Sequence, residues 1–175
     1  GGEKISVVRA DSTCVDSAVA TAVAEGVVAQ GVVAIMGADC PGVTSAIASD
    51  VAVPNGVVMI SPSATSPGLT TLDDKGYFFR TAPSDARGGQ ILADITNDRK
   101  VKSVAITYTN NDYGKSLADV YKAAVEAYGI KVTAVNAHED GKVDYSSEVA
   151  TLALAGGDAV VVIGYHDQGL SLIHI

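Results

Sequence analysis

The sequence predicts an α/β protein made of two Rossmann-like lobes with parallel, doubly wound sheets, truncated at both ends. Apolar runs of strand length alternate with segments of helical periodicity, and Gly or Pro separates most of them. The same organisation occurs twice along the chain, although the two halves differ in sequence. We therefore expect a partial N-terminal lobe at residues 1–83 and a partial C-terminal lobe at residues 84–169.

The composition is that of a folded, acidic protein. Of the 175 residues, 47% are hydrophobic and 18% are charged, which is enough apolar side chain to form a core. The formal net charge of −8 disfavours binding to nucleic acid or to an anionic membrane surface. No apolar run approaches the roughly 20 residues that a membrane-spanning helix requires, so no membrane span is expected.

The first half is predicted to begin with a strand at residues 4–10, which enters the fold almost at the start of the chain. Asp16 is expected to cap a helix over residues 17–30, with Val19, Val23 and Val27 on its buried face. Four further elements and one loop are expected in this half: a strand at 32–36 that is buried on both faces, a helix of small residues ending near 53, a strand at 57–60, a long loop at 61–76 and a strand at 77–80.

The second half repeats this alternation. Ser84 or Asp85 can cap a helix that ends near residue 97, and Asp144 can cap another that runs through residue 154. His138 is expected on the surface, since it follows the second predicted strand of the half and precedes a loop. The other elements expected in the second half are strands at 101–108, 131–135 and 159–163 and a helix at 113–128.

Ligands of such sheets bind outside the carboxyl ends of the strands, which directs attention to four loops. The loop at residues 37–42 has the glycine spacing of a phosphate-binding loop, but Val43 and Thr44 follow where Lys and Ser or Thr are required. What remains there is a helix start whose backbone N–H groups suit a carboxylate. The other loops lie at 61–65, 108–113 and 164–168.

The two cysteines follow neighbouring strands of the first half. Cys14 and Cys40 are compatible with a disulfide in an oxidising compartment, and equally with two free thiols in the cytosol. No metal site is expected, because neither has a close Cys or His partner.

A cysteine-nucleophile enzyme of the α/β hydrolase type would use Cys40 with His138 or His166 as base. We prefer a protein that is not an enzyme, since the glycine that precedes such a nucleophile by two residues is replaced here by Ala38.

Four segments carry a more specific signal: residues 10–16, the loop at Cys40, residues 57–67 and residues 79–85. In order and spacing they resemble the periplasmic branched-chain amino acid binding proteins, and the similarity spans nearly all of residues 1–169. The resemblance implies a type I periplasmic binding fold, a disulfide between Cys14 and Cys40, and two lobes that close on a small amino acid of the Leu, Ile or Val type. It also implies a monomer without a cofactor, located in the periplasm after loss of a signal peptide, which delivers its ligand to the permease of an ABC transporter.

The resemblance further implies ligand contacts in the first lobe. The hydroxyl and backbone N–H of Thr65 would hold the α-carboxylate, and the carbonyl of Ser63, on the other side of Ala64, would accept from the α-ammonium. Both roles suit a buried zwitterion, which needs donors around one group and acceptors around the other. The chain departs from the family at Pro41, where many members place a serine. The N–H of Gly42 is expected to substitute, and a ligand other than a branched-chain amino acid stays open.

In the second lobe, the resemblance places Tyr113 towards the ligand and Tyr165 or His166 over its side chain. The alternative for Tyr113 is packing on its own lobe. The family's acidic group that pairs with the ligand ammonium would lie beyond Gly169.

Residues 170–175 read as a translated sequencing adapter and are expected to be a non-native tail. A ligand-sensing receptor domain with the same fold remains the second alternative.

Overall fold

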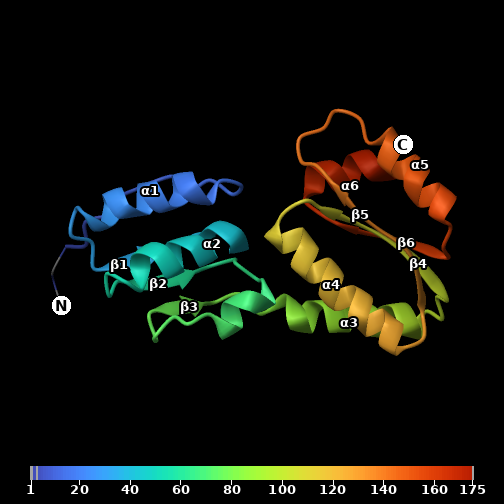
Figure 1. Ribbon diagram of the computed structural model, residues 1–175, viewed down its shortest axis with the longest axis horizontal. Coiled ribbons are helices and arrows are strands. Elements are labelled where there is room, and N and C mark those ends of the chain that lie inside the picture. The colour runs from blue at the N-terminus through green and yellow to red at the C-terminus, as the bar shows by residue number, and fades with distance from the viewer. Residues whose placement is uncertain (1, 3, 175) are drawn as a thin grey trace. The chain divides into compact units, whose positions relative to one another are not determined.

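The computed structural model describes residue 2 and residues 4–174 of the chain (Figure 1). It divides into two compact units, unit 1 at residues 1–83 and unit 2 at residues 84–175, and each has a core of its own. Each unit contains a parallel three-stranded sheet with helices packed on it, so the α/β class with Rossmann-like lobes is confirmed. Within the described residues, no helix is both long enough and apolar enough to cross a membrane.

Unit 1 is built on a sheet of order β1-β2-β3 with all strands parallel. Asp16 caps the first helix as predicted, since its carboxylate accepts from the N–H groups of Ala18 and Val19 at 3.0 Å. The elements are α1 (Ser17–Val28), β1 (Ala34–Met36), α2 (Pro41–Ile47), a π-helix (Ala48–Ala52), β2 (Val58–Ser61), a 3₁₀-helix (Pro67–Thr71) and β3 (Phe78–Arg80).

Three expectations for unit 1 were wrong. Residues 4–10 form no strand, because no described strand pairs with them. The buried positions of α1 are Ala20 and Ala24 instead of its valines, since α1 packs against α2, where small side chains permit close approach. The strand at 32–36 is not buried on both faces: among the described strands, β1 is an edge strand that pairs with β2 alone, and Met36 is 88% exposed.

Unit 2 has the sheet order β5-β4-β6, again all parallel, with β4 in the centre. In Figure 1, α3 and α4 cover one face of this sheet and α5 and α6 lie on the other. The elements are α3 (Asp85–Asp98), β4 (Ser103–Thr109), α4 (Asp112–Ala127), β5 (Lys131–His138), α5 (Ser146–Ala155), β6 (Ala159–Ile163) and α6 (His166–Ile173).

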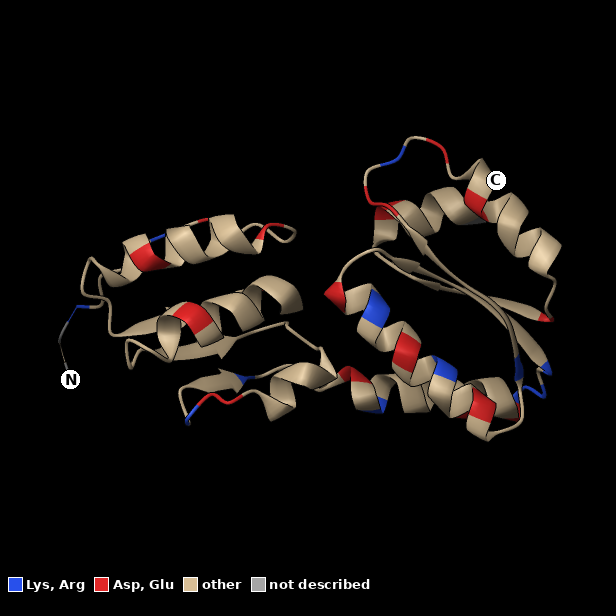
Figure 2. Cartoon of the chain, in the orientation of Figure 1, with Lys and Arg blue, Asp and Glu red and all other residues tan. Residues whose placement is uncertain are grey.

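The helices of unit 2 begin at identifiable caps. Ser84 accepts from Ala86 N–H at 3.3 Å at the start of α3, and Asn111 accepts from Gly114 N–H at 3.0 Å at the start of α4. Figure 2 shows acidic and basic residues alternating along α4, and two pairs in this stripe are bonded: Lys115 with Asp119 and Lys122 with Glu126. The charged stripe marks the solvent side of α4, while Tyr121 on its other side is fully buried.

Three expectations for unit 2 were also wrong. His138 is 1% exposed rather than on the surface, because β5 is three residues longer than predicted and pairs with β4 up to that residue. Asp144 accepts from Ser146 N–H at 2.8 Å, but α5 begins after Tyr145, so Asp144 stands one residue before the N-cap. A helix, α6, begins within the stretch 164–168 that was expected to be a loop.

Candidate functional site

In unit 1, the backbone of the loop that follows β2 is hydrogen-bonded to buried hydroxyl groups. Ser61 Oγ donates to the carbonyl of Ala38 at 2.6 Å and accepts from the N–H of Ala64 at 3.0 Å. Thr44 Oγ1 donates to the same carbonyl of Ala38 at 3.0 Å. Ser61 and Thr44 are both fully buried, so these bonds replace water for the polar groups of the two loops. The loop after β1 and the loop after β2 are thereby joined.

The predicted ligand residues of unit 1 lie in these joined loops. Ser63 is exposed, and its hydroxyl donates to the carbonyl and carboxylate oxygens of Asp39 at 3.1 and 3.2 Å. Ala64 is fully buried and Thr65 is partly buried. Gly42, which is also partly buried, follows Pro41 in the first turn of α2. The structure therefore brings Ser63, Ala64 and Thr65 onto one segment that is bonded to the loop preceding Gly42.

Arg80, at the end of β3, forms further hydrogen bonds to the segment that contains Thr65. Its Nη1 donates to the carbonyl of Ala64 at 3.2 Å and to that of Ser66 at 2.7 Å, and its Nη2 donates to Thr70 Oγ1 at 2.5 Å. The two carbonyls flank Thr65, so the guanidinium sets the course of the backbone around the predicted carboxylate contact. A planar group with several donors in a fixed fork is suited to this role. Arg80 was not among the residues predicted for the site.

Cys14 and Cys40 form a disulfide, which confirms the pairing implied by the family resemblance. Cys40 is the N-cap residue of α2, so the bond ties the segment before α1 to the loop between β1 and α2. In this state, Cys40 carries no thiol for the nucleophile of the enzyme alternative.

In unit 2, two predicted ligand residues are in contact with each other. The rings of Tyr113 and Tyr165 stack with their centroids 5.7 Å apart and their planes at 27°. Asn111 Nδ2 donates to the hydroxyl of Tyr165 at 3.1 Å, while its Oδ1 caps α4. Burial raises the pKa of Tyr113, and the Asp85 carboxylate and Tyr165 add to this effect, so the phenol remains a neutral donor near neutral pH.

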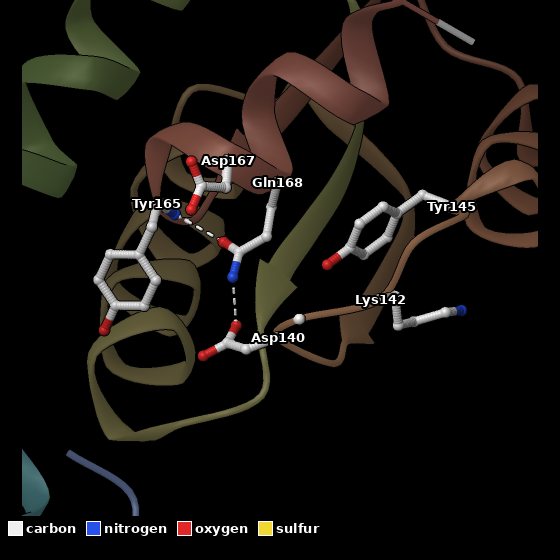
Figure 3. A pocket seen from close by; sticks show the side chains of 7 residues that line it. Asp140, Lys142, Tyr145, Tyr165, Asp167 and Gln168 are labelled. Atoms are coloured by element: carbon white, nitrogen blue, oxygen red, sulfur yellow. Dashed lines mark hydrogen bonds between the residues drawn. The ribbon is translucent and has the colours of Figure 1, made fainter. Parts of the chain in front are cut away.

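His166 does not join this aromatic pair. Its side chain is 83% exposed, and Nε2 lies 2.7 Å from Oδ1 of the neighbouring Asp167. Of the two residues predicted to cover the ligand side chain, only Tyr165 therefore contacts Tyr113. Beside Tyr165 lies a cavity of about 320 Å³ at the carboxyl ends of β5 and β6 (Figure 3). Its lining residues come from the loop after β5 and from the start of α6: Asp140, Gly141, Lys142, Tyr145, Tyr165, Asp167 and Gln168.

His138 lies beneath this edge of the sheet. Its Nδ1 is 2.8 Å from Thr107 Oγ1, and its ring meets Tyr145 edge-on with centroids 5.9 Å apart. Within the described residues, Nε2 has no hydrogen-bond partner. Burial lowers the pKa of His138, although Asp140 and the Gln168 side chain act in the opposite direction. A buried, neutral imidazole of this kind is a structural group of unit 2 and is enclosed away from solvent.

The chain matches the family model described as "Receptor family ligand binding region" over residues 1–174. It belongs to this family. The resemblance to the periplasmic branched-chain amino acid binding proteins is confirmed by two similar proteins. The Leu/Ile/Val-binding protein homolog 3 of Brucella melitensis is 34% identical over 169 residues, which are 96% of this chain and 45% of that protein. The leucine-, isoleucine-, valine-, threonine- and alanine-binding protein of Pseudomonas aeruginosa is 35% identical over 175 residues, with 98% and 46% covered.

Two solved structures of binding proteins have folds similar to that of this chain. The branched-chain amino acid transporter substrate binding protein of Streptococcus pneumoniae, determined in complex with isoleucine, superposes with a TM-score of 0.76 at 29% identity, over 90% of this chain and 44% of that one. A periplasmic binding protein of Burkholderia mallei, 17% identical, has the same fold with a TM-score of 0.82, over 91% of this chain and 42% of that one. The chain thus spans about half the length of the relatives it matches.

Proposed function

We propose that this chain is part of a periplasmic solute-binding protein that captures a branched-chain amino acid and passes it to the permease subunits of an ABC transporter. The observation that carries the proposal is the family match over residues 1–174, together with relatives at 34% and 35% identity that are named as binding proteins for Leu, Ile and Val. Those names favour transport over a sensor role and over catalysis. The proposed protein is a monomer and binds no cofactor.

Unit 1 is proposed to bind the main-chain groups of the ligand. Thr65 would donate its hydroxyl and backbone N–H to the carboxylate, Gly42 would add a backbone N–H, and the carbonyl of Ser63 would accept from the ammonium. The bonds of Arg80 and Ser61 support this assignment, since they hold the backbone on both sides of Thr65. Donors that are fixed before the ligand arrives cost less ordering entropy on binding.

Unit 2 is proposed to bind the ligand through the aromatic pair of Tyr113 and Tyr165. The stacked rings offer an apolar surface next to polar hydroxyl groups, which suits an aliphatic side chain carried on a zwitterion. His166 is proposed only as a residue at the border of this contact, because its side chain is exposed and paired with Asp167.

An amino acid screen tests the ligand class. Thermal unfolding would be followed with each of the twenty amino acids, both on this chain and on a chimera in which it replaces the matching half of the P. aeruginosa relative. A ligand at a hundred times its Kd stabilises the folded protein by about 2.7 kcal/mol. A shift with Leu, Ile or Val supports the proposal, whereas a shift with another amino acid moves the substrate. No shift in either protein would refute amino acid capture.

A pair of threonine variants tests the carboxylate contact. Thr65→Val is expected to weaken leucine binding by roughly ten- to a hundredfold, since a hydrogen bond to a charged group contributes about 1.5–3 kcal/mol. Thr71→Val is the matched control, because its hydroxyl lies on the same loop and donates to the carbonyl of Gly68 at 3.3 Å. Calorimetric Kd values that rise equally in both variants would contradict the assigned role of Thr65.

The tail is tested separately. We propose that residues 170–175 are not native sequence. Mass spectrometry of peptides from the protein purified from its natural source would show whether the stretch after Gly169 is translated there. A peptide that contains residues 165–175 as printed would refute this part of the proposal.

A further inference from the structure

Gln168 is a buried amide that connects the start of α6 to the end of β5. It is 5% exposed. Its Oε1 accepts from the backbone N–H of Tyr165 at 2.7 Å, and its Nε2 donates to Oδ1 of Asp140 at 2.5 Å, as the dashed lines in Figure 3 show. Both hydrogen-bonding ends of the amide are thus used, one on the backbone of a proposed ligand residue and the other on a carboxylate.

Asp140 is in turn bonded to the central strand. Its Oδ1 also accepts from the hydroxyl of Thr109, the last residue of β4, and Thr109 is fully buried. Because β4 lies between β5 and β6, the bonds from Thr109 through Asp140 to Gln168 link the carboxyl ends of all three strands. The Tyr165 backbone is thereby connected through hydrogen bonds to the central strand of the sheet.

The Tyr165 ring is held independently of its backbone. It stacks on Tyr113, and its hydroxyl accepts from Asn111 Nδ2 at 3.1 Å. Asn111 and Tyr113 both belong to the start of α4, so the side chain is fixed by the element after β4 and the backbone by Gln168. If the backbone of Tyr165 moved, the ring would lose either the stack or the hydrogen bond.

The space around Gln168 leaves its amide one orientation. A Cβ at Gly164 would lie 2.7 Å from Gln168 Oε1 and 3.1 Å from His138 Nε2, so the amide oxygen and the buried ring both lie close to the Gly164 backbone. Turning the amide over would place its NH₂ group against the N–H of Tyr165 and its oxygen against the Asp140 carboxylate. Both contacts would then be repulsive.

We propose that Gln168 is a positioning residue: through Asp140 and Thr109 it holds Tyr165 against Tyr113 in the orientation that receives the ligand side chain. The consequence for ligand affinity rests on the proposed function, whereas the consequence for the stacked rings concerns the ligand-free protein. Neither Gln168 nor Asp140 is proposed to touch the ligand.

Three variants test the proposal. Gln168→Met keeps the length of the side chain and removes both bonds, and Asp140→Ala, at an exposed position, removes the acceptor of Nε2. Gln90→Met is the matched control, because Gln90 donates to the Asp94 carboxylate at 2.8 Å in the same manner on α3. Proton NMR of the ligand-free chain would measure the nuclear Overhauser contacts between the rings of Tyr113 and Tyr165. We expect these contacts in the wild type and in Gln90→Met, and their loss in the other two variants.

The affinity for leucine supplies the second measurement. Gln168→Met is expected to weaken binding by about tenfold, and this effect should vanish when Tyr165 is already Ala, because the two residues would act through one contact. A full effect of Gln168→Met in the Tyr165→Ala background would overturn the proposal, as would intact ring contacts in both Gln168→Met and Asp140→Ala. Failure of the wild type to bind leucine would count against the proposed function alone, since the ring contacts still decide the role of Gln168.

Discussion

Removal of the Cys14–Cys40 disulfide is expected to destabilise unit 1 and to leave unit 2 unchanged, since both cysteines lie in unit 1. The bond joins residues 26 positions apart and encloses α1 and β1. In the loop-entropy model, a closed loop of about 26 residues stabilises the folded state by roughly 3.5 kcal/mol at 25 °C. Because a domain has a net stability of only about 5–15 kcal/mol, this contribution is a large share of the total.

Native-state hydrogen exchange on the Cys14→Ser/Cys40→Ser double variant measures the effect unit by unit. The amide of Met59, in the buried centre of β2, is expected to exchange roughly 300-fold faster, while that of Ile106 in β4 keeps its rate. Reducing agent should produce the same change in the wild type and none in the variant. Equal acceleration of both amides, or less than about a threefold change at Met59, would refute the reasoning.

Three further perturbations are predicted. Gly114→Ala should cost several kcal/mol in thermal unfolding, because its Cβ would lie 2.2 Å from the carbonyl oxygen of Thr109, whereas Gly88→Ala, with its nearest atom at 3.8 Å, should stabilise α3 by up to about 1 kcal/mol. Arg80→Lys should speed hydrogen exchange at residues 64–70, and Arg99→Lys should not; equal rates in both would show that the fork of Arg80 is not needed. The lowered pKa of folded His138 means that the unfolded state binds its proton first, so stability should fall as the pH drops below about 6.5. Urea unfolding between pH 5 and 8 should show a shallower pH dependence in His138→Gln, and parallel curves would contradict this.

The elements that sequence predicted well are those with a local signal. Asp16 and Ser84 cap α1 and α3 because their short polar side chains can accept from the first free N–H groups, which depends only on neighbouring residues. The Gly129 turn and the apolar run of β4 likewise stand where expected. The pairing of the cysteines came from the family resemblance, since spacing alone left two possibilities open.

The expectations that were wrong depend on long-range neighbours. Residues 4–10 have a strand-like composition, but a strand exists only through a partner, and none of the described strands pairs with them. His138 was expected on the surface because it precedes a loop, yet its burial follows from the pairing of β5 with the distant strand β4, where Thr109 lies opposite it. The exposed face of β1 could not be foreseen either, since its position at the sheet edge is a property of topology.

The same distinction applies to the site. The proposed ligand residues Thr65, Tyr113 and Tyr165 came from the family resemblance, whereas Arg80 and Gln168 act through hydrogen bonds to neighbouring groups, which leave little trace in sequence. Gln168 had one available signal: it stands three residues after the N-cap Tyr165, the position from which a Gln side chain reaches back to the N-cap N–H. That signal is useful only where α6 is expected, whereas the sequence predicts a loop at residues 164–168.

Both units hold their proposed ligand contacts by internal bonds, and this bears on affinity. In unit 1, the backbone around Thr65 is bonded to Arg80 and Ser61; in unit 2, Tyr165 is bonded through Gln168 and Asn111. Groups that are already ordered add no further ordering cost when a ligand binds, which for each mobile side chain would be about 0.5–1.5 kcal/mol. Loss of one internal bond should therefore weaken binding without removing any atom that contacts the ligand. Variants such as Arg80→Lys and Gln168→Met would then lower affinity through ordering, and a variant such as Thr65→Val through a lost contact.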